Sequence, residues 1–234
     1  MRVGIMQPYF VPYMGYFHLI NAVDLFILLD DVEWSKGGWV NRNRILVNGK
    51  PKFLTLPIQR PGLHAQIRDI ELGEPLETVR QRVSGQVVGA YRKAPRGKEV
   101  ERLIASCMSE DLQKVSEINA ASLRICGDLL GIEVAWGVAS ELDPNPSLTG
   151  VARVLGLIEL SGGTHYINLP GGRGLYDGER FAANGIDLAF VEPELRPYPQ
   201  FDSSFVPGLS VLDVVAFCSP SEVREQAKLY RLES

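Results

Sequence analysis

The sequence contains few of the residues from which metal sites and disulfide frameworks are built. Its 234 residues include 3 cysteines and 3 histidines. The cysteines stand far apart in apolar surroundings, without the spacing of a zinc site or a disulfide framework, so we expect them to be small core residues. The histidines are equally dispersed. We therefore predict no metal site built from these side chains.

Long apolar runs and a strong excess of one charge are also absent. No run approaches the ~20 apolar residues of a membrane-spanning helix. The N-terminus has only Arg2 ahead of a strand-like segment and lacks the apolar core of a signal peptide. The net charge of -4 provides no overall attraction to DNA or membrane. We expect a cytoplasmic protein that has neither a membrane nor DNA among its partners.

What the sequence does contain is an alternation of strand-like and helix-like segments. Residues 3–6 and 25–29 are apolar runs typical of buried strands, and a short helix is predicted between them, from Gly15. Strand, helix, strand is the order of an α/β protein. We predict a Rossmann-like, mostly parallel sheet with a β-hairpin insertion and a helical middle region.

The chain is predicted to form a single domain, 1–234, in three parts. Residues 1–72 hold the α/β opening and the hairpin. Apolar stripes at helical spacing predict helices over 75–131. Residues 132–234 return to an α/β pattern that closes the sheet.

Local signals place several elements within these parts. Asn48-Gly49 predicts the hairpin turn, and residues 67–72 alternate like a further strand. Gly131 is predicted to end the last middle helix, and Ser221 to cap the final helix of the chain. Strands of the closing part are expected at 132–136, 165–168 and 187–191.

A stiff aromatic loop follows the first predicted strand. Prolines restrict its backbone, and Gly15 permits a close approach. Ligands of open α/β sheets bind at the carboxyl ends of strands, so we expect this loop to line a site; the alternative is a tightly packed aromatic loop. Its candidate residues are Gln7, Tyr9, Tyr13, Tyr16 and His18.

The same loop resembles in part the N-terminal signature of the nucleotidylyltransferase superfamily. There, a His-x-Gly-His motif at the start of a helix holds the nucleotide phosphates. Tyr13-Met14-Gly15-Tyr16 stands at that place in this chain. Tyrosine can donate a hydrogen bond to phosphate but lacks the charge of a protonated imidazole. The resemblance therefore supports the fold and argues against adenylyl transfer.

Two carboxylates, Asp30 and Asp31, follow the second predicted strand. Adjacent strand residues point to opposite faces, so only one can face a given site. It could be a general base, a magnesium ligand or a binder of a hydroxyl or ammonium group; the alternative is a pair of solvated acids. Because we expect surface positions for Asp31 and Arg42, Asp31→Ala and Arg42→Ala should fold but lose ligand binding.

The segment from residue 39 to residue 44 combines an aromatic residue with amides and guanidinium groups. Trp39 lies in a glycine-rich loop able to close over a flat or apolar ligand. In a strand, Arg42 and Arg44 share one face, which would make a clamp for carboxylate or phosphate. Asn41 and Asn43 share the other face. The alternative is a solvated sheet edge without a function.

A further polar cluster follows the strand predicted at 165–168. Glycines between a strand and a helix let backbone N–H groups face an anion. Without the full phosphate-loop spacing, a flexible turn is the alternative. The candidates in this segment are Asn168, Gly171, Gly172 and Tyr176.

Longer motifs together resemble the WbqC-like protein family. They include Ile5-Met6-Gln7-Pro8-Tyr9-Phe10, Trp39-Val40-Asn41-Arg42-Asn43-Arg44-Ile45, Tyr91-Arg92-Lys93-Ala94-Pro95, Tyr198-Pro199-Gln200 and Leu209-Ser210-Val211-Leu212-Asp213. The resemblance covers nearly the whole chain and adds Gln200 to the substrate-binding candidates. Arg96-Gly97 replaces the aromatic pair that commonly follows Lys-Ala-Pro in the family.

The resemblance implies a function in O-antigen or other surface-polysaccharide biosynthesis, or in specialised metabolism. It also implies a transferase of glycyl or related groups. We therefore predict an acyl or aminoacyl transferase acting on an amine or hydroxyl of a small acceptor such as an amino sugar. Asp30 or Asp31 would act as base, and Gln7 would bind the polarised carbonyl.

The expected partners of such a transferase are a small-molecule donor and a small-molecule acceptor. The identity of the donor and the functional class of the protein stay open. ATP with magnesium and an acyl thioester are both compatible with the sequence, and aminoacyl-tRNA stays among the donors. The alternatives are an ATP-dependent nucleotidylyltransferase-like ligase and a non-catalytic nucleotide-sugar-binding protein. The sequence does not address the oligomeric state.

Overall fold

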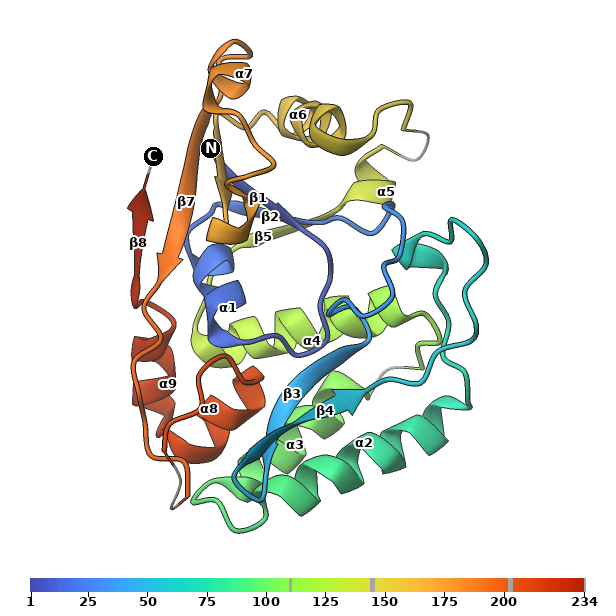
Figure 1. The fold of residues 1–234 in the computed structure, drawn as a ribbon, viewed down its shortest axis with the longest axis vertical. Helices are drawn as coiled ribbons and strands as arrows, with labels where there is room; N and C mark the ends of the chain where they lie inside the picture. Colours follow the sequence, from blue (N-terminus) through green and yellow to red (C-terminus); the bar gives the residue numbers. More distant parts are fainter. Residues whose placement is uncertain (110, 144–145, 202–203, 234) are drawn as a thin grey trace.

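The computed structural model describes residues 1–109, 111–143, 146–201 and 204–233. Within them, a six-stranded sheet has the order β5-β2-β1-β6-β7-β8 (Figure 1). All pairs are parallel except β7 with β8. The α/β prediction with a mostly parallel sheet is confirmed. The strands are β1 (Arg2–Met6), β2 (Leu25–Leu28), β5 (Ala135–Val138), β6 (His165–Asn168), β7 (Asp187–Pro193) and β8 (Tyr230–Glu233).

The direction in which strands are added reverses between β1 and β6. From β1 the chain proceeds through β2 to β5 on one side, and then crosses back to β6 and β7 on the other. This is the order of the Rossmann fold, in which a crevice opens where the order reverses, outside the carboxyl ends of the strands. The fold therefore creates a binding position between the ends of β1 and β6.

Helices cover both faces of the sheet. The helices of the described residues are α1 (Met14–Asn21), α2 (Leu76–Tyr91), α3 (Gly97–Cys107), α4 (Val115–Leu130), α5 (Ala139–Leu142), α6 (Gly150–Leu160), α7 (Gly178–Ala182), α8 (Val211–Phe217) and α9 (Pro220–Gln226), with 3-10 turns η1 (Ile67–Asp69) and η2 (Pro170–Gly172); not all of them lie on the sheet. Alternate strand residues enter two cores, as the two-residue period of a strand requires. Val3, Ile5 and Ile27 lie in the smaller core, and Phe26 and Leu28 in the larger one.

The hairpin and the helical middle region lie together beside the sheet (Figure 1). The hairpin consists of β3 (Arg42–Val47) and β4 (Lys50–Thr55). Asn48 and Gly49 have φ of 50° and 73°, the positive values that a tight hairpin turn requires. Gly131 ends α4 with φ 71°. Both predictions from these turn residues are confirmed.

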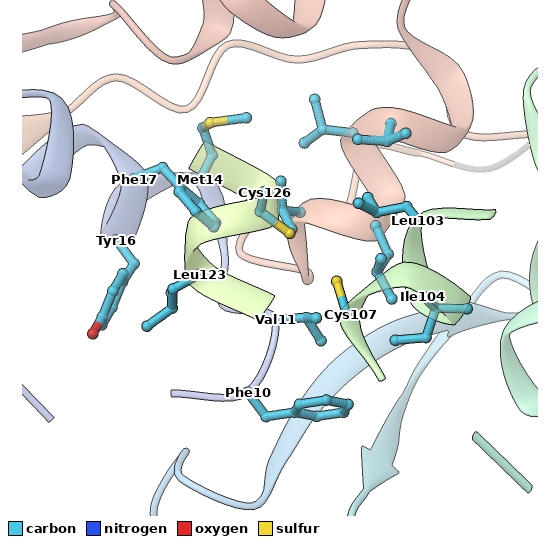
Figure 2. Close-up of a cluster of buried hydrophobic side chains, with 14 of the residues drawn as sticks. Phe10, Val11, Met14, Tyr16, Phe17, Leu103, Ile104, Cys107, Leu123 and Cys126 are labelled. Carbon is cyan, nitrogen blue, oxygen red and sulfur yellow. The ribbon is translucent and has the colours of Figure 1, made fainter. Parts of the chain in front are cut away.

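The larger core joins all three parts of the chain. Figure 2 shows Phe10 and Val11 of the aromatic loop among Leu103 and Ile104 of α3 and Leu123 of α4. Leu212 of α8 belongs to the same core.

The cysteines are core residues, as predicted. All three are free and buried: Cys107, Cys126 and Cys218. A hydrogen bond with Cys107 and burial raise the pKa of the Cys126 thiol well above its usual value. Such thiols are unreactive because the thiolate is the nucleophile.

Three local predictions were wrong. In place of the strand predicted over 67–72, Ile67–Asp69 form the turn η1, with Ile67 and Ile70 buried, and Glu71 and Leu72 make only isolated β-bridges. The strand predicted at 132–136 begins at Ala135, because the Ile132 N–H donates to Gly127 O and completes the end of α4. The cap of α9 is Ser219 in place of Ser221: its hydroxyl accepts from the Glu222 N–H, and the Glu222 carboxylate accepts from the Ser219 N–H.

Candidate functional site

A cavity of about 780 Å³ lies at the carboxyl ends of β1 and β6, where the strand order reverses. We call it the switch-point cavity. Its volume is within the range of small-molecule sites, and its position is the one at which α/β sheets bind ligands. The predicted site residues that line it are Gln7, Tyr9, Tyr13, Trp39, Asn43, Arg44, Asn168, Gly171, Gly172 and Tyr176.

Tyr13 and Tyr16, the pair predicted from the Tyr-x-Gly-Tyr motif, have different environments. The Tyr13 ring lies over Gly15 at the start of α1: a Cβ on Gly15 would be 2.3 Å from Tyr13 Cε2. Only glycine allows this ring position. Tyr16 is fully buried, and its hydroxyl donates to Gln7 O at 2.7 Å. Tyr13 therefore lines the cavity, whereas Tyr16 supports the loop from the core.

The aromatic loop is held in a strained shape by distant side chains. Val11 has φ 34°, an unfavourable value for a β-branched residue. Ser210 Oγ donates to Val11 O at 2.7 Å, and Asn119 Nδ2 donates to Pro8 O at 2.9 Å. Asn43 Nδ2 donates to Phe10 O at 3.1 Å. These bonds compensate for the strain and fix the groups on the cavity side of the loop.

Three side chains on this loop keep unused hydrogen-bonding capacity. Within the described chain, no partner is found for the Gln7 amide or for the hydroxyls of Tyr9 and Tyr13, and all three residues line the cavity. Burial raises the pKa of Tyr9 and that of Tyr13. Both hydroxyls therefore stay protonated at neutral pH and can donate to a ligand.

Arg44 supplies the positive charge of the site. Its Nη2 donates to Gly208 O at 3.0 Å, its guanidinium carbon lies 5.6 Å from the centre of a Trp39 ring, and its Nε is buried without a partner. No acidic residue is found among the described residues that line the cavity. An arginine in the cavity lining with no opposing carboxylate suits an anionic group.

The predicted two-arginine clamp is not assembled at this cavity. Arg42 donates from Nε to Gly38 O at 3.2 Å and also binds Gly37 O. Its guanidinium lies over the Phe53 ring at 4.3 Å. Asn41 donates to Leu56 O at 3.0 Å. Arg42 and Asn41 thus shape the hairpin and its preceding loop and do not line the cavity.

The asparagines of the cavity wall use their side chains to position backbone. Asn43 Oδ1 accepts from the Arg44 N–H at 2.9 Å. Asn168 Nδ2 donates to Tyr166 Oη at 2.7 Å, and its Oδ1 accepts from the Leu169 N–H at 2.6 Å. The Gly172 N–H donates to Leu169 O at 2.9 Å. The polar atoms after β6 are therefore largely satisfied within the turn η2.

The two aspartates lie outside the switch-point cavity. Asp30 accepts from Ser140 N–H at 3.1 Å and Ser140 Oγ at 2.7 Å, and it lines a second cavity. Asp31 Oδ2 pairs with Arg153 Nη2 at 2.6 Å, with the two side chains 1% and 4% exposed. The expectation that Asp31 is a surface group is therefore wrong, because the chain after β2 turns inward against α6.

His18 and Gln200 also lie away from the cavity lining. His18 is fully buried with its Nε2 2.7 Å from Gln226 O, and burial lowers its pKa. Gln200 Nε2 donates to Asp213 Oδ2 at 2.5 Å. Asp213 is fully buried and also accepts from Tyr91 and Tyr198 hydroxyls, at 3.0 Å and 2.7 Å.

Sequence reasoning missed this network as a unit. Tyr91 is 122 positions from Asp213, and no spacing rule connects it with Tyr198, Gln200 and Asp213. Their one common signal is that all four fall within the motifs that resemble the family. The same reasoning missed Leu175, which is 68% exposed and contributes an apolar wall to the cavity.

The described part of the chain has neither a metal-binding cluster nor a membrane-spanning helix. No group of three or more His, Cys, Asp or Glu side chains there could hold a metal ion. No helix in that part has the length and apolar character needed to cross a bilayer.

The fold and the cavity together define an α/β protein with a cavity at the switch point of a Rossmann-type sheet. The chain belongs to the WbqC-like protein family, whose model matches residues 7–225. It is also similar to the uncharacterized protein Rv1507c of Mycobacterium tuberculosis, at 28% identity over 218 residues and 92% of each chain. No solved structure gives a significant match.

Proposed function

We propose that this protein is a transferase that holds the donor of a small acyl or aminoacyl group, glycyl included, in the switch-point cavity. The acceptor is an amine or hydroxyl of a small molecule such as an amino sugar. The observation that carries the proposal is the set of unused donors around the cavity, the Gln7 amide and the Tyr9 and Tyr13 hydroxyls, beside the guanidinium group of Arg44. Donors of this kind bind anions and polarised carbonyl oxygens.

In the proposed reaction, Arg44 binds the anionic part of the donor, and Trp39 and Leu175 contact its apolar part. The amine or hydroxyl of the acceptor attacks the carbonyl carbon, and the bond from that carbon to the leaving group breaks. Gln7 and a tyrosine hydroxyl donate to the carbonyl oxygen as its negative charge develops. The leaving group departs with the electron pair, and the acceptor proton goes to it or to water.

The environment of Asp30 and Asp31 argues against the role of general base that the sequence suggested for them. Asp31 is paired with Arg153, and both Asp30 oxygens accept from Ser140. We therefore assign the chemistry to positioning and oxyanion stabilisation, which do not need a carboxylate in the cavity. An acyl thioester or an acyl adenylate is the proposed donor. Cytoplasmic synthesis of surface polysaccharide is the proposed setting, and it is supported by the family resemblance.

A nucleotidylyltransferase-like ligase is the second candidate function. The strand order and the Tyr13-x-Gly15-Tyr16 segment at the start of α1 favour it. Its weakness is Tyr16, whose hydroxyl is bound to Gln7 O in the core and is not free for phosphate. A non-catalytic nucleotide-sugar-binding protein is the third candidate.

Ligand-induced thermal stabilisation tests the proposal. Acetyl coenzyme A, ATP with magnesium, UDP-sugars and dTDP-sugars are screened at millimolar concentration; a ligand at 100 times its Kd adds about 2.7 kcal/mol of stability. Arg44→Gln should weaken binding of an active ligand at least about tenfold. Arg102→Gln, an equal charge change on the exposed face of α3, is the control.

The outcomes separate the candidates. Coenzyme A release in the presence of amino sugars supports acyl transfer. Pyrophosphate release from ATP that depends on a carboxylic acid favours the ligase, and sugar-nucleotide binding without turnover favours the binding protein. Binding that is equal in Arg44→Gln and wild type contradicts the proposed site.

A further inference from the structure

A second cavity of about 450 Å³ lies at the carboxyl ends of β2 and β5, against the first turns of α4. We call it the α4 cavity. Gln7 and Tyr9 line the switch-point cavity, whereas Pro8 between them lines this one. Figure 1 shows the start of α4 on the same side of the molecule as α5, which follows β5. The same sheet edge thus carries two distinct cavities.

The start of α4 opens on this cavity without a side-chain cap. Lys114 occupies the N-cap position, and its side chain makes no capping hydrogen bond. Ser116, in the first turn, lines the cavity and is 8% exposed, and within the described residues its hydroxyl has no partner. The Val115 N–H donates to Ile70 O at 2.9 Å, which leaves the Ser116 and Glu117 N–H groups. An unpartnered hydroxyl beside such N–H groups at the positive end of a helix dipole is an arrangement that binds an anion.

Three basic residues line this cavity: Arg68 and Lys114, and Arg124 further along α4. None of the ion pairs found among the described residues involves them. Arg124 lies 5.9 Å from the centre of a Trp136 ring. These side chains are free to pair with a ligand.

Acidic side chains limit which anions fit. Asp30 lines the cavity with both oxygens bound to Ser140, and Glu117 and Glu141 are exposed at its edge. Three basic and three acidic residues give no net attraction for a polyanion. The cavity therefore favours a ligand with one anionic group seated at the helix start.

We propose that the α4 cavity binds a small molecule through a single phosphate or carboxylate group, held by Ser116 and the uncapped N–H groups of α4. Lys114, Arg68 and Arg124 neutralise its charge. Arginine and helix N-termini both bind phosphate and carboxylate oxygens. This site uses no residue of the switch-point cavity and does not depend on acyl transfer there.

Amide chemical shifts measured on the whole chain test the proposal. Inorganic phosphate and acetate are titrated separately at constant ionic strength, with chloride as the reference anion. We expect saturating shifts of the Ser116 and Glu117 amide signals with at least one of the two, and the tighter of them identifies the anionic group.

Two variants sharpen the test. Ser116→Ala and the double variant Lys114→Gln/Arg124→Gln should each raise the Kd of that anion, the double variant at least about tenfold. Lys98→Gln/Arg102→Gln removes the same charge from the exposed face of α3 and should leave the Kd unchanged. Shifts that are linear and equal to those of chloride overturn the proposal, as does an unchanged Kd in the double variant.

Discussion

At the scale of single residues, charge is buried at two places that are far apart in sequence and structure. Arg153 is 3% exposed and joins Asp31 to Asp143 beneath α5 and α6. Asp213 is fully buried and accepts hydrogen bonds from Tyr91, Tyr198 and Gln200. Neither group lines the switch-point cavity. Both fit a structural role better than a role in substrate binding.

Asp31→Ala should destabilise the protein by up to about 3–5 kcal/mol, because it removes the fully buried one of the two carboxylates that pair with the buried Arg153 guanidinium. Asp143→Ala is the matched control, since that side chain is 31% exposed and should cost much less. Urea unfolding measures the free energy of unfolding of both variants, and an unchanged m-value shows that the midpoint shift reflects stability. Equal stability of Asp31→Ala and wild type would show that the Arg153 pair is not needed for folding.

Asp213 should make a pH-dependent contribution to stability. Burial raises the pKa of Asp213 from 3.8, although its three hydrogen bonds oppose the shift. A carboxyl group with a raised folded-state pKa stabilises the fold fully below its unfolded value and loses that contribution as pH rises through the folded value. The stability of wild type relative to Asp213→Asn should therefore increase as pH falls from neutral toward the unfolded-state value of about 3.9.

Urea unfolding of both proteins across this pH range measures the difference, in which the other carboxyl groups cancel. Burial also raises the pKa of Tyr91 and that of Tyr198, so these partners stay protonated throughout. A difference that is constant or that shrinks on acidification contradicts the prediction.

At the scale of elements, the aromatic loop and α1 form one unit with two faces. Tyr16 and Phe17 belong to the larger core, and Gln7, Tyr9 and Tyr13 line the cavity. Gly15 lets the loop pack closely on α1, because the Tyr13 ring occupies the space that a Cβ of residue 15 would fill. The loop can therefore present unsatisfied polar groups to a ligand while its other side is anchored.

Gly15→Ala should separate stability from binding. Alanine favours the helix by up to about 1 kcal/mol, but its Cβ would lie 2.3 Å from Tyr13 Cε2 and must displace the ring. We expect weaker ligand binding with little loss of stability. Thermal shifts with any ligand of the switch-point cavity measure both effects.

Gly85→Ala in α2 is the control, because a Cβ there meets nothing within 4 Å. It should raise stability by about 0.5–1 kcal/mol and leave binding unchanged. Unaltered binding in Gly15→Ala would mean that the position of the Tyr13 ring is unimportant.

At the scale of the whole molecule, the strand order decides where a ligand can bind. Gln7 and Asn168 are 161 positions apart and meet at one cavity because β1 and β6 are neighbours. Asp30 and Ser140 meet in the same way at the ends of β2 and β5. The order β5-β2-β1-β6 thus divides the sheet edge into two cavities.

The three parts of the chain should unfold together. The larger core contains Phe10, Leu103 and Leu212, one from each part, so no part can leave without exposing apolar surface of the others. We expect a single calorimetric transition with equal calorimetric and van't Hoff enthalpies. A separate earlier transition of the helical region would contradict this single cooperative unit.

The sequence predicted elements and turns well where the signal is local. The hairpin turn at Asn48-Gly49, the end of α4 at Gly131 and the strand at 165–168 depend on backbone preferences and short-range periodicity. The 67–72 strand failed because alternation over so few residues also fits a 3-10 turn with one buried side. Ser219 was overlooked as the α9 cap although Pro220 and Glu222 mark it.

The sequence by itself determined the α/β class, the WbqC-like family and the segments from which a site could be built. Only the tertiary structure decided which of their side chains share a cavity, because that depends on strand order and on contacts between distant residues. Arg44 Nε has no hydrogen-bond partner, whereas the Arg42 guanidinium donates to the carbonyl oxygens of Gly37 and Gly38. Asp31 forms an ion pair with Arg153, and Gln7 lines the switch-point cavity.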